Sequence, residues 1–180
     1  MNTTRSMIKK ISTAVLLSLL VTASALAQHG DWVRVEPPGA GFSLLMPTRP
    51  AESVETKEQF TVHTFATSDG AAVFVAVYVD YVPSMKINES AELAANRDNF
   101  LKGLDARLTS SKEIKLDGRA GLEFTGEDDR RLYKSRVYIL GNRVHQIASA
   151  TLKDDPAADK VDRFFASFAF TAATDAHGKP

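Results

Sequence analysis

One run of five charged residues has the composition to do chemistry, because three acids directly precede two arginines. Carboxylates beside guanidinium groups can bind an ion, can act as an acid/base pair, or can form exposed ion pairs at the corner of a hairpin. Exposed ion pairs are the usual outcome for such a run. If the protein has a partner-binding corner, we expect it to consist of Glu127, Asp128, Asp129, Arg130 and Arg131.

Metal binding needs clustered ligands, and the histidines are scattered. His29 and His177 lie near the ends of the expected mature chain, while His63 and His145 fall in expected strands. The sequence has no HxH, no HExxH and no acidic calcium loop. His63 and His145 could meet across a sheet, although a packing role with His145 beside Tyr138 is favoured. We therefore expect no metal and no cofactor.

Nucleophilic catalysis finds equally little support. The chain has no cysteine and no GxSxG elbow, and its serines fall in expected strands, helix starts and turns. A triad could still assemble from distant residues, because triads are recognised by geometry. The glycine-containing residues 37–41 lie between two expected strands, so we interpret them as a stiff connection. A phosphate-binding loop would instead directly precede a helix. We expect a protein that is not an enzyme, with an unrecognised hydrolase as the catalytic alternative.

Residues 1–27 have the pattern of a secretory signal peptide. Three basic residues precede an apolar run, which ends in Ala25, Leu26 and Ala27. The run is shorter than the roughly 20 residues that span a bilayer. No cysteine follows it that could carry a lipid anchor. We expect export to the periplasm or beyond as a soluble protein without stable membrane insertion.

Residues 28–180 have the length of one ordinary domain, which can bury a core without disulfides. Basic and acidic residues are equal in number over the whole chain, and Arg5, Lys9 and Lys10 leave with the signal peptide. The remaining domain is slightly acidic, so it lacks the basic surface that nucleic acid or anionic lipid requires. We expect no nucleic-acid partner.

The first half of this domain is expected to form strands, because β-branched and aromatic residues recur there at period two between turn residues. Residues 31–36 and 41–46 are two candidates. Residues 52–57 and 59–65 form two further strands or one long bent strand. Residues 71–82 are apolar on both faces, which is typical of a central strand covered on both sides.

Residues 88–108 change to a helical period, with apolar residues at three- and four-residue steps. Asn88 or Ser90 can cap the start of this helix. The opposite, solvated face is expected to carry Glu89, Glu92, Asp98 and Lys102.

Two hairpins are expected next. In the first, a two-residue turn at residues 117–118 would pair Leu116 with Arg119, whereas a three-residue loop would pair Leu116 with Ala120. The longer loop is favoured because it keeps the apolar side chains on one face. In the second hairpin, glycine precedes asparagine at residues 141–142, which favours a type II′ turn with Ile139 opposite Val144.

The last element is expected to be a buried helix, with Asp155 as its cap and Pro156 at its first position. Its apolar stripe comprises Ala157, Val161, Phe164, Phe165 and Phe168. Residues 171–180 have nothing to bury and are expected to form a mobile tail. One domain, residues 28–170, is therefore expected.

Residues 41–50 read GFSLLMPTRP and predict a core strand, with Phe42, Leu44 and Met46 on one face, Leu45 buried on the other, and prolines ending the pairing. The chain resembles secreted bacterial proteins of the PsbP family in the order of its segments. After this strand come the valine-aromatic strand VFVAVYVDY, the GRAGLEF strand, the RLYKSRVYILGNRVHQI hairpin and the terminal FFASFAF.

The resemblance implies an α/β (α+β) fold, namely a twisted, mostly antiparallel sheet with helices on its faces in an α/β/α sandwich related to the Mog-type fold. It also implies a non-catalytic accessory or assembly role. No metal-site motif or photosystem-docking segment of that family is matched. The leading hypothesis is an exported domain that binds a protein partner in the cell envelope. The alternative is a small-ligand or metal-binding module, with its pocket between sheet and helix.

Overall fold

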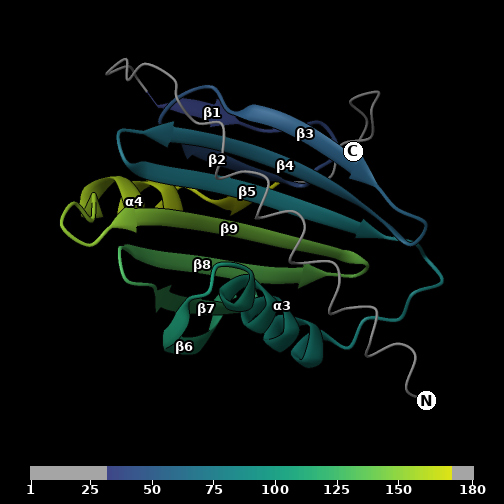
Figure 1. Cartoon of the computed structure of the whole chain (residues 1–180). Coiled ribbons are helices and arrows are strands. Elements are labelled where there is room, and N and C mark those ends of the chain that lie inside the picture. The colour runs from purple at the N-terminus through teal and green to yellow at the C-terminus, as the bar shows by residue number, and fades with distance from the viewer. Residues whose placement is uncertain (1–31, 172–180) are drawn as a thin grey trace.

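The computed structural model describes residues 32–171, which form two β-sheets and two helices (Figure 1). The expected signal peptide lies outside the described residues. Of the expected tail, only Thr171 is described, and its backbone N–H donates to the Gly41 carbonyl at 3.0 Å. Within the described part of the chain, no helix is long and apolar enough to cross a membrane.

The larger sheet has seven strands in the order β3-β4-β5-β9-β8-β7-β6, and every neighbouring pair is antiparallel. The two segments expected near residues 52–65 are two separate strands that pair with each other. The seven strands are β3 (Ala51–Thr56), β4 (Phe60–Asp69), β5 (Ala72–Tyr81), β6 (Arg107–Leu116), β7 (Arg119–Glu127), β8 (Arg131–Leu140) and β9 (Arg143–Leu152).

A smaller sheet contains β1 (Val33–Val35), β2 (Phe42–Met46) and β10 (Ala169–Phe170), with β2 in the middle. The core strand expected at β2 is confirmed, because Phe42, Leu44 and Met46 are all buried. Leu45, expected to be buried on the opposite face, is only half-buried. The pairing of β10 with β2 brings the two ends of the described chain together.

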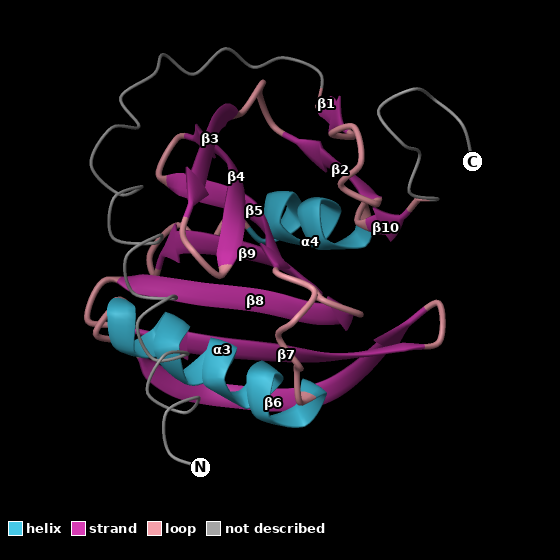
Figure 2. Ribbon diagram, turned by 90° about the vertical axis from the view of Figure 1, so that its right-hand side faces the viewer, coloured by secondary structure: helices cyan, strands magenta, loops and turns pink. Residues whose placement is uncertain are grey.

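The two faces of the larger sheet are covered differently (Figure 2). One face carries α4 (Ala158–Ala166) together with the smaller sheet, and the other carries α3 (Glu89–Gly103). The expected fold class is confirmed as α+β with a large antiparallel sheet and two helices. β5 serves both faces, because Phe74 and Tyr78 join the core beside α4 whereas Tyr81 joins the core beside α3.

The β8–β9 hairpin has the expected register, with Ile139 opposite Val144. The three-residue loop expected between β6 and β7 is wrong, since Leu116 pairs with Arg119 across a two-residue turn. Both turn residues, Asp117 and Gly118, have positive φ, at 51° and 77°. An Asp-Gly pair is well suited to such a turn, whose twist matches that of the strands. The apolar residues of β6 and β7 therefore serve opposite faces of the sheet.

Helix α3 begins after Asn88, whose side chain accepts a hydrogen bond from the Ala91 N–H, so the expected cap is confirmed. The helix ends at Gly103, earlier than expected, and Leu108 lies in β6 with 45% of its surface exposed. The solvated position expected for Glu92 is also wrong. Glu92 is only 6% exposed, because it faces the sheet and accepts a hydrogen bond from the Tyr81 hydroxyl.

Helix α4 does not begin at Asp155 and Pro156 as expected. It begins at Ala158, after Ala157 adopts a left-handed conformation with φ 46° and without a side-chain cap. Asp155 is held in the preceding turn, where its N–H donates to the Leu152 carbonyl. Of the expected apolar stripe, Phe164, Phe165 and Phe168 are buried, and Ala157 and Val161 are partly buried against the same core. Ala157 and Phe168 lie outside the helix, because α4 extends only from Ala158 to Ala166.

Candidate functional site

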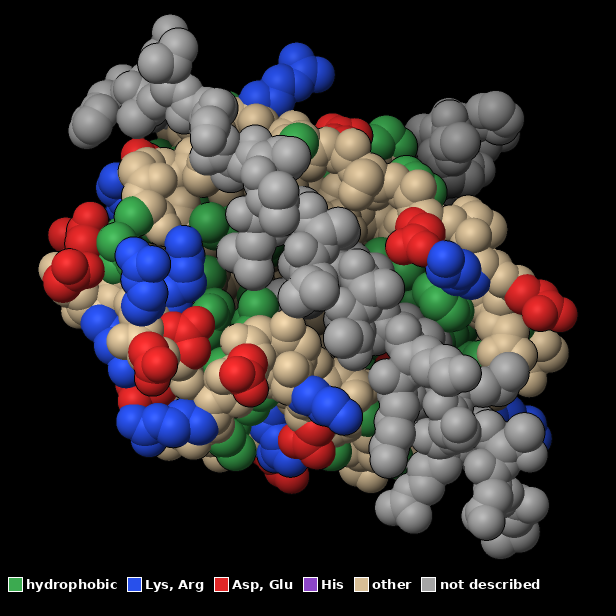
Figure 3. Space-filling view, in the orientation of Figure 1, with side chains coloured by type: hydrophobic (Ala, Val, Ile, Leu, Met, Phe, Trp, Pro, Cys, Tyr) green, Lys and Arg blue, Asp and Glu red, His purple; other side chains and the backbone are tan. Residues whose placement is uncertain are grey.

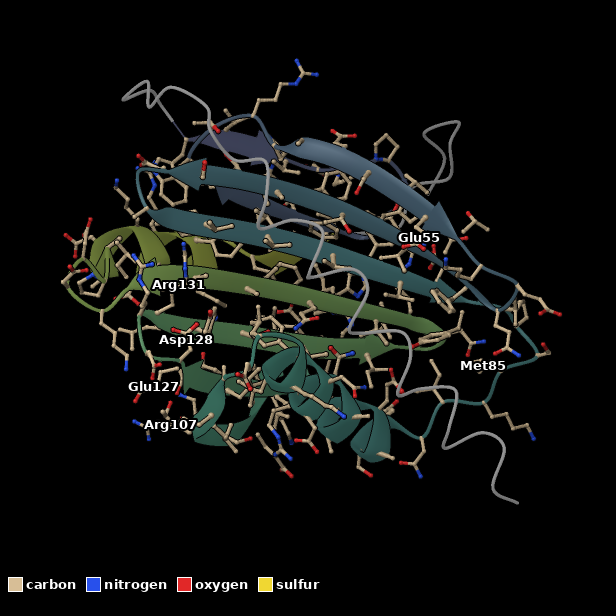
Figure 4. All side chains as sticks on the ribbon, in the orientation of Figure 1. Glu55, Met85, Arg107, Glu127, Asp128 and Arg131 are labelled. Atoms are coloured by element: carbon tan, nitrogen blue, oxygen red, sulfur yellow. The ribbon has the colours of Figure 1, made fainter. Side chains whose placement is uncertain are left out.

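The five charged residues singled out in the sequence line one cavity of about 520 Å³ at a corner of the larger sheet. We call this the corner cavity. It lies where β7 ends and β8 begins, and Figure 4 shows Glu127, Asp128 and Arg131 there with Arg107 of β6. The structure adds residues from the start of β6 and from the end of β9, so the complete lining is Leu104, Asp105, Arg107, Glu127, Asp128, Asp129, Arg130, Arg131 and Lys153.

The backbone of the β7–β8 corner is organised by Asp128. Its Oδ1 accepts hydrogen bonds from the backbone N–H groups of Arg130 and Arg131, each at 2.7 Å. This is the local pattern by which aspartate side chains stabilise turns. The Lys153 N–H donates to the Arg130 carbonyl at 3.0 Å, which fixes the corner to the end of β9.

The second oxygen of Asp128 is also occupied. The Tyr133 hydroxyl donates to Oδ2 at 2.6 Å. This hydrogen bond, together with those from the backbone, holds the pKa of Asp128 below its usual range, while burial raises the pKa of Tyr133. Asp128 is therefore an ionised turn residue, and the three hydrogen bonds leave it poorly suited to proton transfer.

Glu127 lies between two cations. It pairs with Arg107, which is opposite to it in the β6–β7 ladder, and with Lys153 at 3.5 Å. Strands β6 and β7 come close together beside this pair because residue 126 is glycine. A Cβ at that position would meet Leu101 and would lie 2.9 Å from the Arg107 carbonyl oxygen. The Glu127 carboxylate is thus neutralised within the protein.

The two arginines of the β7–β8 corner differ from Glu127 and Asp128. Arg131 is half-buried, and its Nη1 is buried without a hydrogen-bond partner among the described residues. Arg130 and Asp129 are exposed and take part in none of the described ion pairs. Cationic and anionic side chains gather side by side on the left of Figure 3, over this corner. The corner therefore offers guanidinium groups for recognition.

A second cavity, of about 710 Å³, lies between the N-terminal half of α3 and the β6–β7 hairpin. Its wall contains apolar residues such as Leu93, Ala94 and Leu122, and charged residues such as Glu89 and Lys115. It occupies the kind of position, between helix and sheet, that the small-ligand hypothesis requires.

The two described histidines do not form a joint site. His63 stacks on Tyr78 with ring centroids 4.2 Å apart, and Tyr78 separates it from His145. His145 is 1% exposed, and its Nε2 lies 3.0 Å from the Ala40 carbonyl oxygen. Within residues 32–171, no group of three or more histidine or acidic side chains could hold a metal ion.

Sequence reasoning missed Asp105, Arg107 and Lys153 as members of the corner. Arg107 lies 20 residues from Glu127, and no local pattern links the two. The register of β6 against β7 could have identified Arg107, because it places the two residues opposite each other. The strand expected there begins only at Ser110, so it does not include Arg107.

No protein-family model matches the chain, and no curated protein matches it in sequence. Among solved structures, it is similar to cyanobacterial PsbP (CyanoP) from Synechocystis sp. PCC 6803, with a TM-score of 0.58 and 13% identity over 84% of this chain and 99% of that chain. LpqN of Mycobacterium tuberculosis, described as involved in cell envelope biogenesis, gives a TM-score of 0.44 and 11% identity over 81% of this chain and 93% of that chain. A protein of unknown function from Pseudomonas aeruginosa, PA94, gives a TM-score of 0.41 and 16% identity over 74% and 95% of the two chains. The likeness to CyanoP shows a PsbP-like fold.

Proposed function

We propose that this protein is an exported, non-enzymatic domain that binds a protein partner in the cell envelope through the corner cavity, as an accessory or assembly factor. The observation that carries the proposal is a difference in bonding between two acids and two arginines at the corner. The carboxylates of Asp128 and Glu127 are engaged by the protein itself, whereas Arg130 and Arg131 take part in none of the described ion pairs. Arginine is enriched at protein interfaces because its planar group binds carboxylates and stacks on aromatic rings.

Two further observations support the proposal. Residues 1–27 have the pattern of a secretory signal peptide, which would deliver the domain to the envelope. The fold is similar to that of CyanoP, and the resemblance of the sequence to the PsbP family implies an accessory role. Fold likeness alone does not carry function, so the corner remains the main argument.

The proposal is tested by site-specific photocrosslinking in living cells. A photoreactive amino acid replaces Arg130, which is exposed at the corner, or Lys86, an exposed residue in the loop before α3. We expect position 130 to crosslink one defined envelope protein and position 86 to crosslink none. Equal capture at both positions, or no specific product at position 130, would contradict binding through the corner.

The cavity between α3 and the β6–β7 hairpin favours a second candidate function, the binding of a small amphipathic molecule. A thermal-shift screen with fatty acids and small carboxylic acids tests it, because a ligand at 100 times its Kd adds about 2.7 kcal/mol of stability. A genuine ligand of this cavity should lose its effect in Ala94→Trp, which fills the cavity, and keep it in Ala51→Trp, on the exposed edge strand β3.

A further inference from the structure

We propose that the corner cavity recognises a carboxylate on an acidic segment of the partner protein, and that Arg131 is the residue that binds it. This inference rests on the proposed function and adds the chemistry of the partner to it. Its starting point is Arg131, which lines the cavity and whose Nη1 is a buried donor without an acceptor among the described residues. Buried donors are nearly always paired, and a charged one is the most unfavourable to leave unpaired.

No described residue accepts a hydrogen bond from this donor. Asp128, three residues before Arg131, already accepts from two backbone N–H groups and from Tyr133. Glu127 is shared between Arg107 and Lys153. A carboxylate from outside therefore completes the hydrogen bonding of Arg131 without displacing an existing bond.

The remaining acids on the wall, Asp105 and Asp129, lie at the exposed mouth of the cavity, where water screens them. Arg131 is half-buried, so its attraction for an anion is screened less. When the Arg131 guanidinium turns toward the cavity, it can form two parallel hydrogen bonds with a carboxylate there. Exposed Arg130 lies beside it and adds a second cation.

The balance of charges on the cavity wall favours a singly charged anion over a doubly charged one. The lining contains four cationic and four acidic side chains, so the cavity as a whole is neutral. A singly charged carboxylate needs only the local pair with Arg131. A phosphate dianion carries more charge into a wall that contains four carboxylates, and like charges repel it. A glutamate or aspartate side chain of a polypeptide also fits the protein partner of the proposed function.

The experiment uses the full chain and a defined probe, the peptide acetyl-Gly-Glu-Gly-amide, with its Gln analogue and inorganic phosphate as comparisons. Binding is followed by NMR shifts of the backbone amides of residues 128–131. We expect saturable shifts with the Glu peptide, at least tenfold weaker binding in Arg131→Gln, and partial retention in Arg131→Lys. The matched control Arg34→Gln, an exposed arginine of β1 that pairs with Glu36, should bind like the wild type.

Three outcomes would overturn the inference. They are unchanged binding in Arg131→Gln with a native amide spectrum, equal binding of the Gln peptide, and binding of phosphate as tight as that of the Glu peptide. The crosslinking experiment separates this inference from the proposed function. If Arg131→Gln leaves the product at position 130 undiminished, the carboxylate inference fails while partner binding at the corner stands. If position 130 gives no product, the proposed function fails whatever the peptide does.

Discussion

Asp128 and Arg131 are three residues apart and have opposite roles at the corner. The carboxylate of Asp128 is engaged at both oxygens, so its chemistry is structural. The guanidinium of Arg131 has a buried nitrogen without a partner among the described residues, and for this reason we propose that it binds a carboxylate. A run of charges in a sequence thus contains both kinds of residue, and hydrogen-bond partners distinguish them.

The structural role of Asp128 predicts a clear loss of stability on substitution. Asp128→Asn replaces one acceptor oxygen by an NH₂ group and removes the charge that strengthens the three hydrogen bonds, which should lower the free energy of unfolding by about 1–3 kcal/mol. Urea denaturation monitored by circular dichroism measures it. Asp129→Asn is the control, since this exposed neighbour takes part in no described ion pair and should change stability by less than about 0.5 kcal/mol. Equal effects of the two substitutions would contradict the assignment.

At the scale of elements, the corner depends on how closely α3 approaches the start of β6 and the end of β7. Gly126 lies opposite Leu108, next to an irregularity in the β6–β7 ladder. A side chain at position 126 would meet Leu101 of α3 and the Arg107 backbone. Helix and hairpin are therefore packed against each other through a position that has room for glycine alone.

Gly126→Ala is expected to destabilise the protein by about 1–3 kcal/mol, because the added methyl group overpacks this contact. Leu101→Ala should destabilise on its own by leaving a cavity. In the double substitution the effects should be less than additive, since the smaller residue 101 makes room for the new methyl group. A double-mutant cycle of unfolding free energies measures the coupling. Strictly additive changes in the free energy of unfolding would show that the side chains at the two positions do not clash.

At the scale of the whole molecule, the two sheets are joined through a buried aromatic group around His145. Its ring lies 5.8 Å from that of Phe42 in β2 and 5.3 Å from that of Phe170 in β10. Its Nε2 faces the Ala40 carbonyl oxygen, while its Nδ1 is buried without a partner among the described residues. Burial lowers the pKa of His145 to about 4. The docking of the smaller sheet thus depends on a neutral imidazole.

This arrangement predicts a pH dependence of folding stability. The unfolded chain takes up a proton near pH 6.5 but the folded chain only near pH 4, so stability is complete above pH 6.5 and falls as the pH drops toward 4. The loss attributable to His145 should reach about 3 kcal/mol. Urea titrations of the wild type and His145→Gln between pH 7 and 4 measure it, with His63→Gln as the control. An identical slope in the wild type and His145→Gln would contradict this role.

Some of the structure followed from neighbouring residues alone. The β8–β9 hairpin was predicted in the correct register, because Gly141 and Asn142 define the turn and alternating side chains define the faces. The same reasoning gave the wrong loop at Asp117, where it preferred one apolar face to the turn chemistry of Asp-Gly. The five charged residues of the corner were recognised as a unit for the simple reason that they are contiguous.

The sequence by itself determined the charged run and the approximate positions of most strands and of both helices, because side-chain alternation, capping and turn residues act over a few positions. Tertiary structure decided the rest. It brought Arg107 and Lys153 to Glu127, buried Glu92 of α3 against the sheet and paired β10 with β2. These features depend on which distant residues the sheet places opposite each other. A local pattern carries no information on that pairing, so the division between occupied and available charges appears only in the folded molecule.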